Sequence, residues 1–184
     1  AFQNQTKLIE IVLPDSVTVI GSYAFADTGL TALTLPANLK SLGDYFLSGT
    51  KGVKTLTIPS GVTRMNYSSE GALKSSSVEK LIFEDGIQTI PACAARYASS
   101  LTEVVIPESV TKIDSYAFAY CSALKNIDLP ENVTYISESA FWNCSTMESL
   151  TLPDSITGIG EYAFAYTGLT ALTLPANLKS LGDY

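Results

Sequence analysis

Apolar positions recur along the chain with a period of about 23 residues, a length typical of repeat architectures. The first apolar residue of each copy is Leu8, Leu30, Val53, Val78, Leu101, Leu124, Met147 or Leu169, so that consecutive copies begin at nearly constant intervals. Such a fixed period indicates a solenoid, in which each repeat buries its apolar face against its neighbours. The sequence therefore predicts a single array of about eight turns over residues 1–184.

Each copy contains a predicted strand with one buried face. The positions of Val104 and Ile106 are apolar in all eight copies, and one variable position separates them, which is the period of two expected of a strand. Pro107, like the proline of most other copies, ends the strand because it cannot donate to a ladder. A second short extended segment is expected at residues 110–113, and residues 115–120 are predicted to form about one helical turn. Stacking of the copies predicts a parallel sheet in a β-rich α/β solenoid.

A column of large apolar residues is expected to form the spine of the core. Its members are Phe2, Phe25, Leu47, Phe118, Phe141 and Phe164. The segment between Met65 and Val78 carries a net insertion, which predicts a projecting polar loop. The following copy has Ala95 at the spine position, and we expect Leu73 or Tyr97 to fill the space that the missing ring leaves.

Part of the array is duplicated. Residues 13–45 and 152–184 are identical except at four positions, and the second segment lies six repeats after the first. We interpret the chain as a fragment of a longer array, in which a six-repeat block at 13–151 begins again at 152. No terminal repeat resembles a polar cap, so end-to-end self-association through exposed strand edges is expected.

Composition disfavours several classes of function. The net charge is −7 and the 11 basic residues are scattered, which argues against binding of nucleic acid or of an anionic membrane surface. No run of 18 apolar residues is present, so we expect no membrane insertion of this segment. The absence of histidine removes Ser-His and Cys-His dyads and histidine zinc sites, and the carboxylates fall mainly in turns. We therefore expect no enzyme, and no metal or cofactor.

The repeat resembles a known family. The segments VIPESVTKIDSYAFAYC, at 105–121, and TLPDSITGIGEYAFAYT, at 151–167, match the pattern LPxSVTxIGxxAFxxC and resemble the BspA-like class of leucine-rich repeats. The resemblance covers essentially the whole chain and implies a right-handed leucine-rich-repeat solenoid. It also implies a surface or secreted protein, of bacteria or some protists, that takes part in adhesion. The family has no shared catalytic residues that could be placed on this sequence.

Two surfaces are candidate binding sites. The first is an aromatic cluster that follows the spine position in three consecutive copies, consisting of Tyr120, Trp142, Asn143 and Tyr166. Aromatic residues give a large contact area at low entropy cost, but these rings could instead pack on neighbouring turns. The second is the outward row of the first strands, which includes Ile82, Val105 and Asp128 and could equally be an ordinary exposed sheet.

Two of the three cysteines also fall in one column. Cys121 and Cys144 are one turn apart, a separation of about 4.8 Å between stacked strands that a disulfide permits. Threonine, serine or alanine occupies the same column in other copies, which favours a small buried residue over a bridge.

These observations lead to two hypotheses. The first is a non-catalytic adhesion or recognition module at the cell surface or in the secreted space, with an extracellular protein or glycan as its partner. The alternative is a structural stalk that presents another domain, because copying repeats lengthens a spacer without altering a site.

Overall fold

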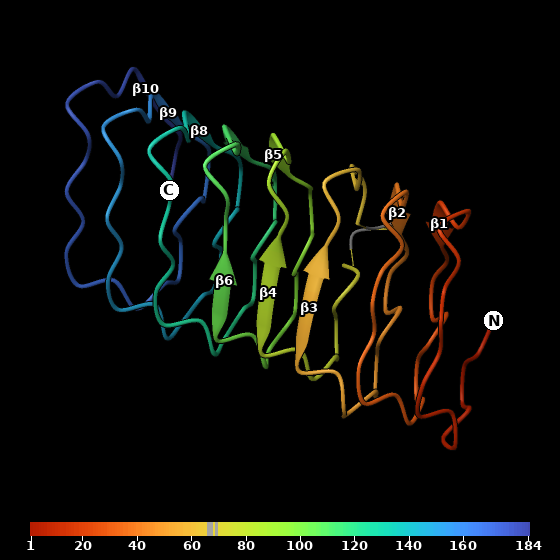
Figure 1. The fold of residues 1–184 in the computed structure, drawn as a ribbon. Coiled ribbons are helices and arrows are strands. Elements are labelled where there is room, and N and C mark those ends of the chain that lie inside the picture. Colours follow the sequence, from red (N-terminus) through yellow and green to blue (C-terminus); the bar gives the residue numbers. More distant parts are fainter. Residues whose placement is uncertain (66–67, 69) are drawn as a thin grey trace.

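The computed structural model describes residues 1–65, 68 and 70–184. The chain winds into a parallel solenoid, with its two ends at opposite ends of the coil (Figure 1). It has about seven turns rather than the eight expected, because the segments before Leu8 and after Leu169 are partial copies. The predicted polar loop includes residues 66, 67 and 69, which lie outside the described residues.

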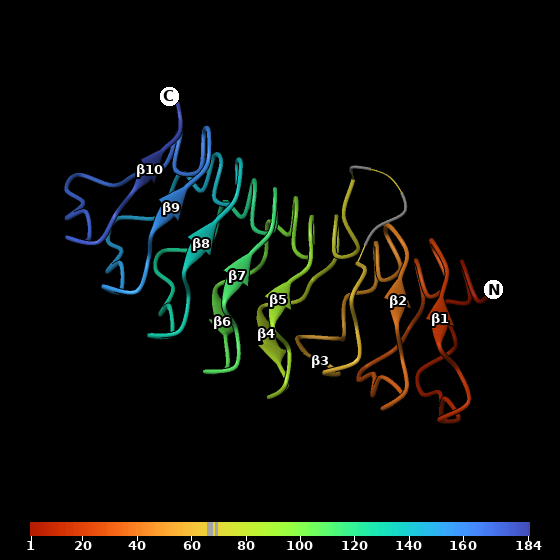
Figure 2. The same ribbon diagram turned by 90° about the horizontal axis from the view of Figure 1, so that it is seen from above.

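The second extended segments form most of the regular sheet. Their strands are β1 (Val19–Ile20), β2 (Ser41–Leu42), β5 (Thr89–Ile90), β7 (Lys112–Ile113), β8 (Tyr135–Ile136), β9 (Gly158–Ile159) and β10 (Ser180–Leu181). β1 pairs with β2, and β5, β7, β8, β9 and β10 form a five-stranded parallel sheet. Figure 2 shows these strands in a row along the coil. The inward residue of each pair is Ile20, Leu42 or an equivalent, and all but the last of these are buried.

The first segments form a regular sheet in three turns. β3 (Thr55–Ile58), β4 (Lys80–Phe83) and β6 (Glu103–Val105) pair in parallel, with Leu81 opposite Leu56 on one side and Val104 on the other. In other turns the segment is irregular, although its start is still held, as where the Thr31 N–H donates to the Ile9 carbonyl at 3.2 Å. The predicted parallel sheet is therefore present but interrupted.

The prediction of one-turn helices is wrong: the described residues contain no helix. Instead, each turn of the solenoid closes with a run of tight turns that forms a third ladder. Alternate N–H groups donate to the next turn of the coil, as from Tyr116, Phe118 and Tyr120 to the carbonyls of Glu138, Ala140 and Trp142 at 3.1, 2.8 and 2.7 Å. The N–H groups between them donate to the carbonyl three residues earlier.

The spacing of the coil explains why no helix forms. Stacked strands are about 4.8 Å apart, whereas an α-helix with its side chains is about 10 Å wide. A helix also points its N–H groups along its own axis, so they could not donate sideways to the neighbouring turn. The tight turns require a left-handed backbone at two positions four residues apart, such as Tyr116 at φ 58° and Tyr120 at φ 62°.

The core contains the predicted spine. Phe141 is fully buried, and its ring stacks on Phe118 at 5.4 Å and on Phe164 at 5.5 Å between centroids. Ala95 and Leu73 are both fully buried, so Leu73 holds the spine position of the turn before Ala95. Tyr97 lies half-buried on the outer flank instead.

The cysteine column satisfies inward-pointing carbonyls. All three cysteines are buried, and none of them forms a disulfide. The Cys121 thiol donates to the Ala95 carbonyl, and the Cys144 thiol donates to the Phe118 carbonyl, both at 3.1 Å. Thr50 makes the equivalent bond to the carbonyl of Phe25 at 2.7 Å. Thr28 and Thr167, in the same column, donate to the carbonyls of Phe25 and Phe164 in their own turns. The column therefore holds small residues, most of which satisfy a buried carbonyl of the spine position.

Candidate functional site

The third ladder presents the predicted aromatic residues on one flank of the coil. Tyr120, Asn143 and Tyr166 occupy the same left-handed position in three consecutive turns, at φ 62°, 56° and 59°. Trp142 occupies the position just before it. Asp27 and Gly49 fill this left-handed position in earlier turns, and such residues accept it readily. For a tyrosine the conformation costs on the order of 1–3 kcal/mol.

The structure brings these rings together around Trp142. The Trp142 ring lies 5.2 Å from Tyr120, 6.3 Å from Tyr116 and 6.5 Å from Tyr166, and is inclined to all three. We call Tyr116, Tyr120, Trp142 and Tyr166 the flank cluster. Asn143 lies beside it, half-buried, and its N–H donates to the Ala165 carbonyl at 2.9 Å.

Exposure differs sharply within the flank cluster. Tyr116, Tyr120 and Trp142 are half-buried, and among the described residues the Trp142 Nε1 has no hydrogen-bond partner. Tyr166 is 72% exposed. Packing on neighbouring turns thus accounts for the partial burial of Tyr120 and Trp142. Most of the Tyr166 side chain, in contrast, remains open to solvent.

The flank cluster belongs to a longer series of rings and cations that sequence reasoning missed. Tyr97 stacks on Tyr120 at 4.5 Å. Lys74 Nζ lies 4.4 Å from the centre of the Tyr97 ring and 5.3 Å from that of Tyr45. The Arg96 guanidinium lies 5.0 Å from Tyr97 and 4.6 Å from Tyr116. The signal was present in the sequence, since Lys74, Arg96 and Trp142 occupy one column of the repeat.

Carboxylates border these rings at equivalent positions of two turns. The Tyr45 hydroxyl donates to Glu70, and the Tyr116 hydroxyl donates to Glu138, both at 2.8 Å. The bond from Tyr116 to Glu138, together with burial, raises the pKa of Tyr116.

Glu70 and Lys74 form an ion pair. The hydrogen bond from Lys74, followed by that from Tyr45, lowers the pKa of Glu70. The same contact with Glu70 raises the pKa of Lys74.

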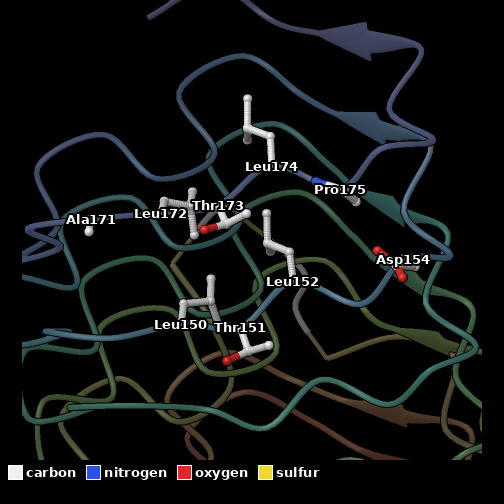
Figure 3. Close-up of a pocket in the computed structure, with 9 residues that line it drawn as sticks. All are labelled: Leu150, Thr151, Leu152, Asp154, Ala171, Leu172, Thr173, Leu174 and Pro175. Carbon is white, nitrogen blue, oxygen red and sulfur yellow. The ribbon is translucent and has the colours of Figure 1, made fainter.

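The second candidate surface, the outward row of the first strands, has fewer side chains that converge on one point. Ile82 and Val105 are paired outward residues of β4 and β6, half-buried and 40% exposed respectively, and Asp128 is exposed beyond the edge of that sheet. Where the first segments diverge, shallow grooves open between turns. One of about 280 Å³ is lined by Leu150, Thr151, Leu152, Asp154, Ala171, Leu172, Thr173, Leu174 and Pro175 (Figure 3). Asp154 is the single ionisable group in this lining, so no set of polar groups converges there.

The described residues contain no group of three or more His, Cys, Asp or Glu side chains arranged to hold a metal ion. Within the same residues, no helix is long and apolar enough to cross a membrane.

Comparison with known proteins points to one family. A model described as BspA type leucine rich repeat region (6 copies) matches residues 1–69 and 67–184. No curated protein matches the chain.

Several solved structures are similar. A leucine-rich repeat protein from Bacteroides ovatus is 25% identical, with a TM-score of 0.73, over 92% of this chain and 44% of that one. A leucine rich cell surface protein from Faecalibacterium prausnitzii is 25% identical, with a TM-score of 0.55, over 87% and 52%. The pneumococcal vaccine antigen PcpA is 26% identical, with a TM-score of 0.55, over 92% and 46%. The chain therefore spans about half the length of these structures.

Proposed function

The chain belongs to the BspA-type leucine-rich repeat family, and we propose that it is a non-catalytic recognition module of a cell-surface or secreted protein. Similarity to a bacterial cell surface protein and to a vaccine antigen supports the location. The flank cluster is the proposed contact surface, with an extracellular protein or glycan as its partner.

One observation carries this proposal: three tyrosine rings gather around Trp142, with ring centroids 5.2 to 6.5 Å from it, and the Tyr166 side chain is 72% exposed. An exposed tyrosine beside a half-buried tryptophan offers the amphipathic contact area on which recognition surfaces depend.

A structural stalk is the second candidate, and the duplication favours it. The second copy of the segment 13–45 keeps all but four of its positions, as expected if added length were the selected property. Copying would extend such a spacer in units of six repeats.

The test is binding of the purified chain to immobilised matrix glycoproteins and to a glycan panel. The variant Tyr120→Asn/Trp142→Ala/Tyr166→Asn introduces the residues found at equivalent positions, those of Asn143 and Ala165. Asn143 already has the left-handed backbone that the third ladder needs, so the fold should tolerate these changes. We expect the intact chain to bind and this variant to lose at least about tenfold in affinity, or about 1.4 kcal/mol.

A matched control is Tyr23→Ser. Tyr23 is a flank tyrosine outside the cluster, and serine occupies its column at Ser139, with the same left-handed backbone. Circular dichroism checks the fold of each variant. If the control loses binding as fully as the triple variant, the contact lies elsewhere; if the intact chain binds none of the probes, the stalk becomes the leading function.

A further inference from the structure

Two turns of the flank carry the same four-residue arrangement. In the first, Tyr45 donates its hydroxyl to Glu70, and Lys74 lies over Tyr45 and Tyr97. The corresponding residues of the second are Tyr116, Glu138, Trp142 and Tyr166. Here too the tyrosine hydroxyl, that of Tyr116, donates to the carboxylate of Glu138 at 2.8 Å. Trp142, which stands where the first arrangement has Lys74, contacts the rings of Tyr116 and Tyr166.

The two arrangements differ in charge. Lys74 neutralises Glu70 in the first. In the second, tryptophan replaces the lysine, and among the described residues neither Glu138 nor Glu161, the next member of its column, forms an ion pair. Both carboxylates are exposed. The second arrangement therefore has the rings and the negative charge of the first without its lysine. Arg96 lies 4.6 Å from the centre of the Tyr116 ring, and among the described residues no cation lies over Tyr166.

The chain itself shows what these rings accept. Lys74 and Arg96 each lie within about 5.3 Å of the centres of two tyrosine rings, within the range of a cation–π contact. A cation from outside has the same kind of surface available at Tyr166, whose side chain is 72% exposed. The net charge of −7 would attract such a group over a longer range.

The duplication supplies an internal comparison. The second copy differs from the first at Ile156, Gly158, Glu161 and Tyr166, where the first has Val17, Val19, Ser22 and Asp27. Two of these differences have packing reasons. Ile156 is fully buried, and a Cβ at Gly158 would lie 2.5 Å from the ring of Tyr135. The other two place a carboxylate and an aromatic ring on the turn next to Trp142.

We propose that Glu138, Trp142, Glu161 and Tyr166 form a docking site for a basic protein segment. A lysine or arginine side chain of the partner lies over the exposed ring of Tyr166, as Lys74 lies over Tyr97, with the two carboxylates beside it. This inference rests on the proposed recognition function and narrows its partner to a protein with clustered positive charge.

The test measures fluorescence anisotropy of a labelled peptide of alternating lysine and glycine titrated with the purified chain. The same peptide with every lysine acetylated is the uncharged probe, and an oligomer of N-acetylglucosamine is the neutral glycan probe. We expect the lysine peptide to bind, acetylation to abolish binding, and affinity to fall as salt rises from about 0.05 M to about 0.5 M.

A double variant and its control measure the contribution of the two carboxylates to binding of the lysine peptide. Glu138→Gln/Glu161→Ser removes both charges, keeps an acceptor for Tyr116 and restores the residue of the first copy at 161; we expect about threefold to tenfold weaker binding. Glu108→Gln, which removes an exposed charge after Pro107, is its control and should leave affinity within about twofold.

Tyr166→Asp also restores the first copy and is the sharper variant. It adds a negative charge while removing a ring, so a partner held by charge alone would bind it more tightly. A cation held on the ring would bind about threefold to tenfold more weakly, which is the expected result. Tighter binding to Tyr166→Asp, or equal binding of the acetylated peptide, would overturn the inference.

The outcomes distinguish this inference from the proposed function. If the neutral glycan binds the intact chain, if the triple flank variant abolishes that binding, and if the lysine peptide does not bind, the flank is a recognition site and the basic partner is wrong. If the matrix glycoproteins, the glycan panel and the peptides all fail to bind, both proposals fall.

Discussion

Replacing Phe141 with alanine removes the middle ring of a three-ring stack. Phe141 has no exposed surface, and its ring lies 5.4 Å from Phe118 and 5.5 Å from Phe164 with near-parallel planes. Truncating a buried phenylalanine costs about 3–5 kcal/mol, and each lost ring pair is worth about 0.5–1.5 kcal/mol beyond the area it buries. Because two pairs are lost, we expect a destabilisation of at least about 4 kcal/mol.

Phe164 provides the internal comparison. It is half-buried, and its one ring contact in the described structure is with Phe141. Phe164→Ala should therefore cost about half as much, or ~2–3 kcal/mol. Phe141→Leu, which introduces the residue found at Leu47 and Leu73, keeps much of the buried volume but loses the same two ring pairs, so it should cost about 1–3 kcal/mol.

The assay is equilibrium unfolding in guanidinium chloride, followed by circular dichroism. The slope of the unfolding free energy against denaturant is compared between variants, because a damaged repeat array can unfold in parts. A cost for Phe164→Ala equal to or above that of Phe141→Ala would refute the view that the stacked spine carries the stability of these turns.

Three further perturbations test other features. Ala95→Phe should lower stability by about 1–3 kcal/mol, because Ala95 and Leu73 are already fully buried; a higher melting temperature in calorimetry would instead reveal a void. Iodoacetamide near pH 8 should leave the native cysteines unmodified, since burial raises the pKa of Cys144 to about 12 and that of Cys121 well above its usual range, and all three should react after denaturation. A mass two units lower in the denatured protein, with two thiols unreactive, would show a bridge. Glu70 has a lowered pKa in the folded state, chiefly through Lys74, so its stabilising contribution is present above its unfolded pKa of about 4.3 and lost as the pH falls through the folded value. Glu70→Gln should flatten the loss of melting temperature below about pH 4, and an unchanged acid limb would contradict the ion pair.

The repeat period and the buried columns could be predicted from the sequence because one physical demand fixes both. Every turn must place an apolar residue at the positions of Leu81 and Val104 to stack on the turn before it, and the pairing of these two residues confirms the register. The interruption of the first-strand sheet could not be predicted, because the diverging segments carry the same alternating pattern as β3, β4 and β6.

One-turn helices were predicted wrongly because a single repeat was considered without its neighbours. Ala117 and Phe118 favour a helix within one repeat, but the coil demands N–H groups that point to the neighbouring turn. The evidence lay across repeats, since one column holds Asn4, Asp27, Gly49 and Asn143, residue types that accept a left-handed backbone. Tyr97, Tyr120 and Tyr166 conceal this signal in the remaining turns.

The aromatic part of the candidate site could be predicted from the repeat, whereas its cations could not. Consecutive copies placed Tyr120, Trp142 and Tyr166 on neighbouring turns, which brought the rings together. The roles of Lys74 and Arg96 depend on long side chains reaching over rings of other turns, and sequence spacing does not fix where such chains lie.

The recognition module and the structural stalk predict different effects of Tyr166 on the stability of the coil. A stalk gains nothing from tyrosine at a left-handed position, where Asp27 and Gly49 serve in other turns at lower strain. The stacking that offsets this strain for Tyr97 and Tyr120, at 4.5 Å, is weak for Tyr166, whose described ring contact is 6.5 Å away. Tyr166→Asn should therefore leave the free energy of unfolding unchanged or raise it by up to about 1 kcal/mol. A loss of more than about 1 kcal/mol in guanidinium unfolding would show that the ring stabilises the coil, and its retention would then need no partner.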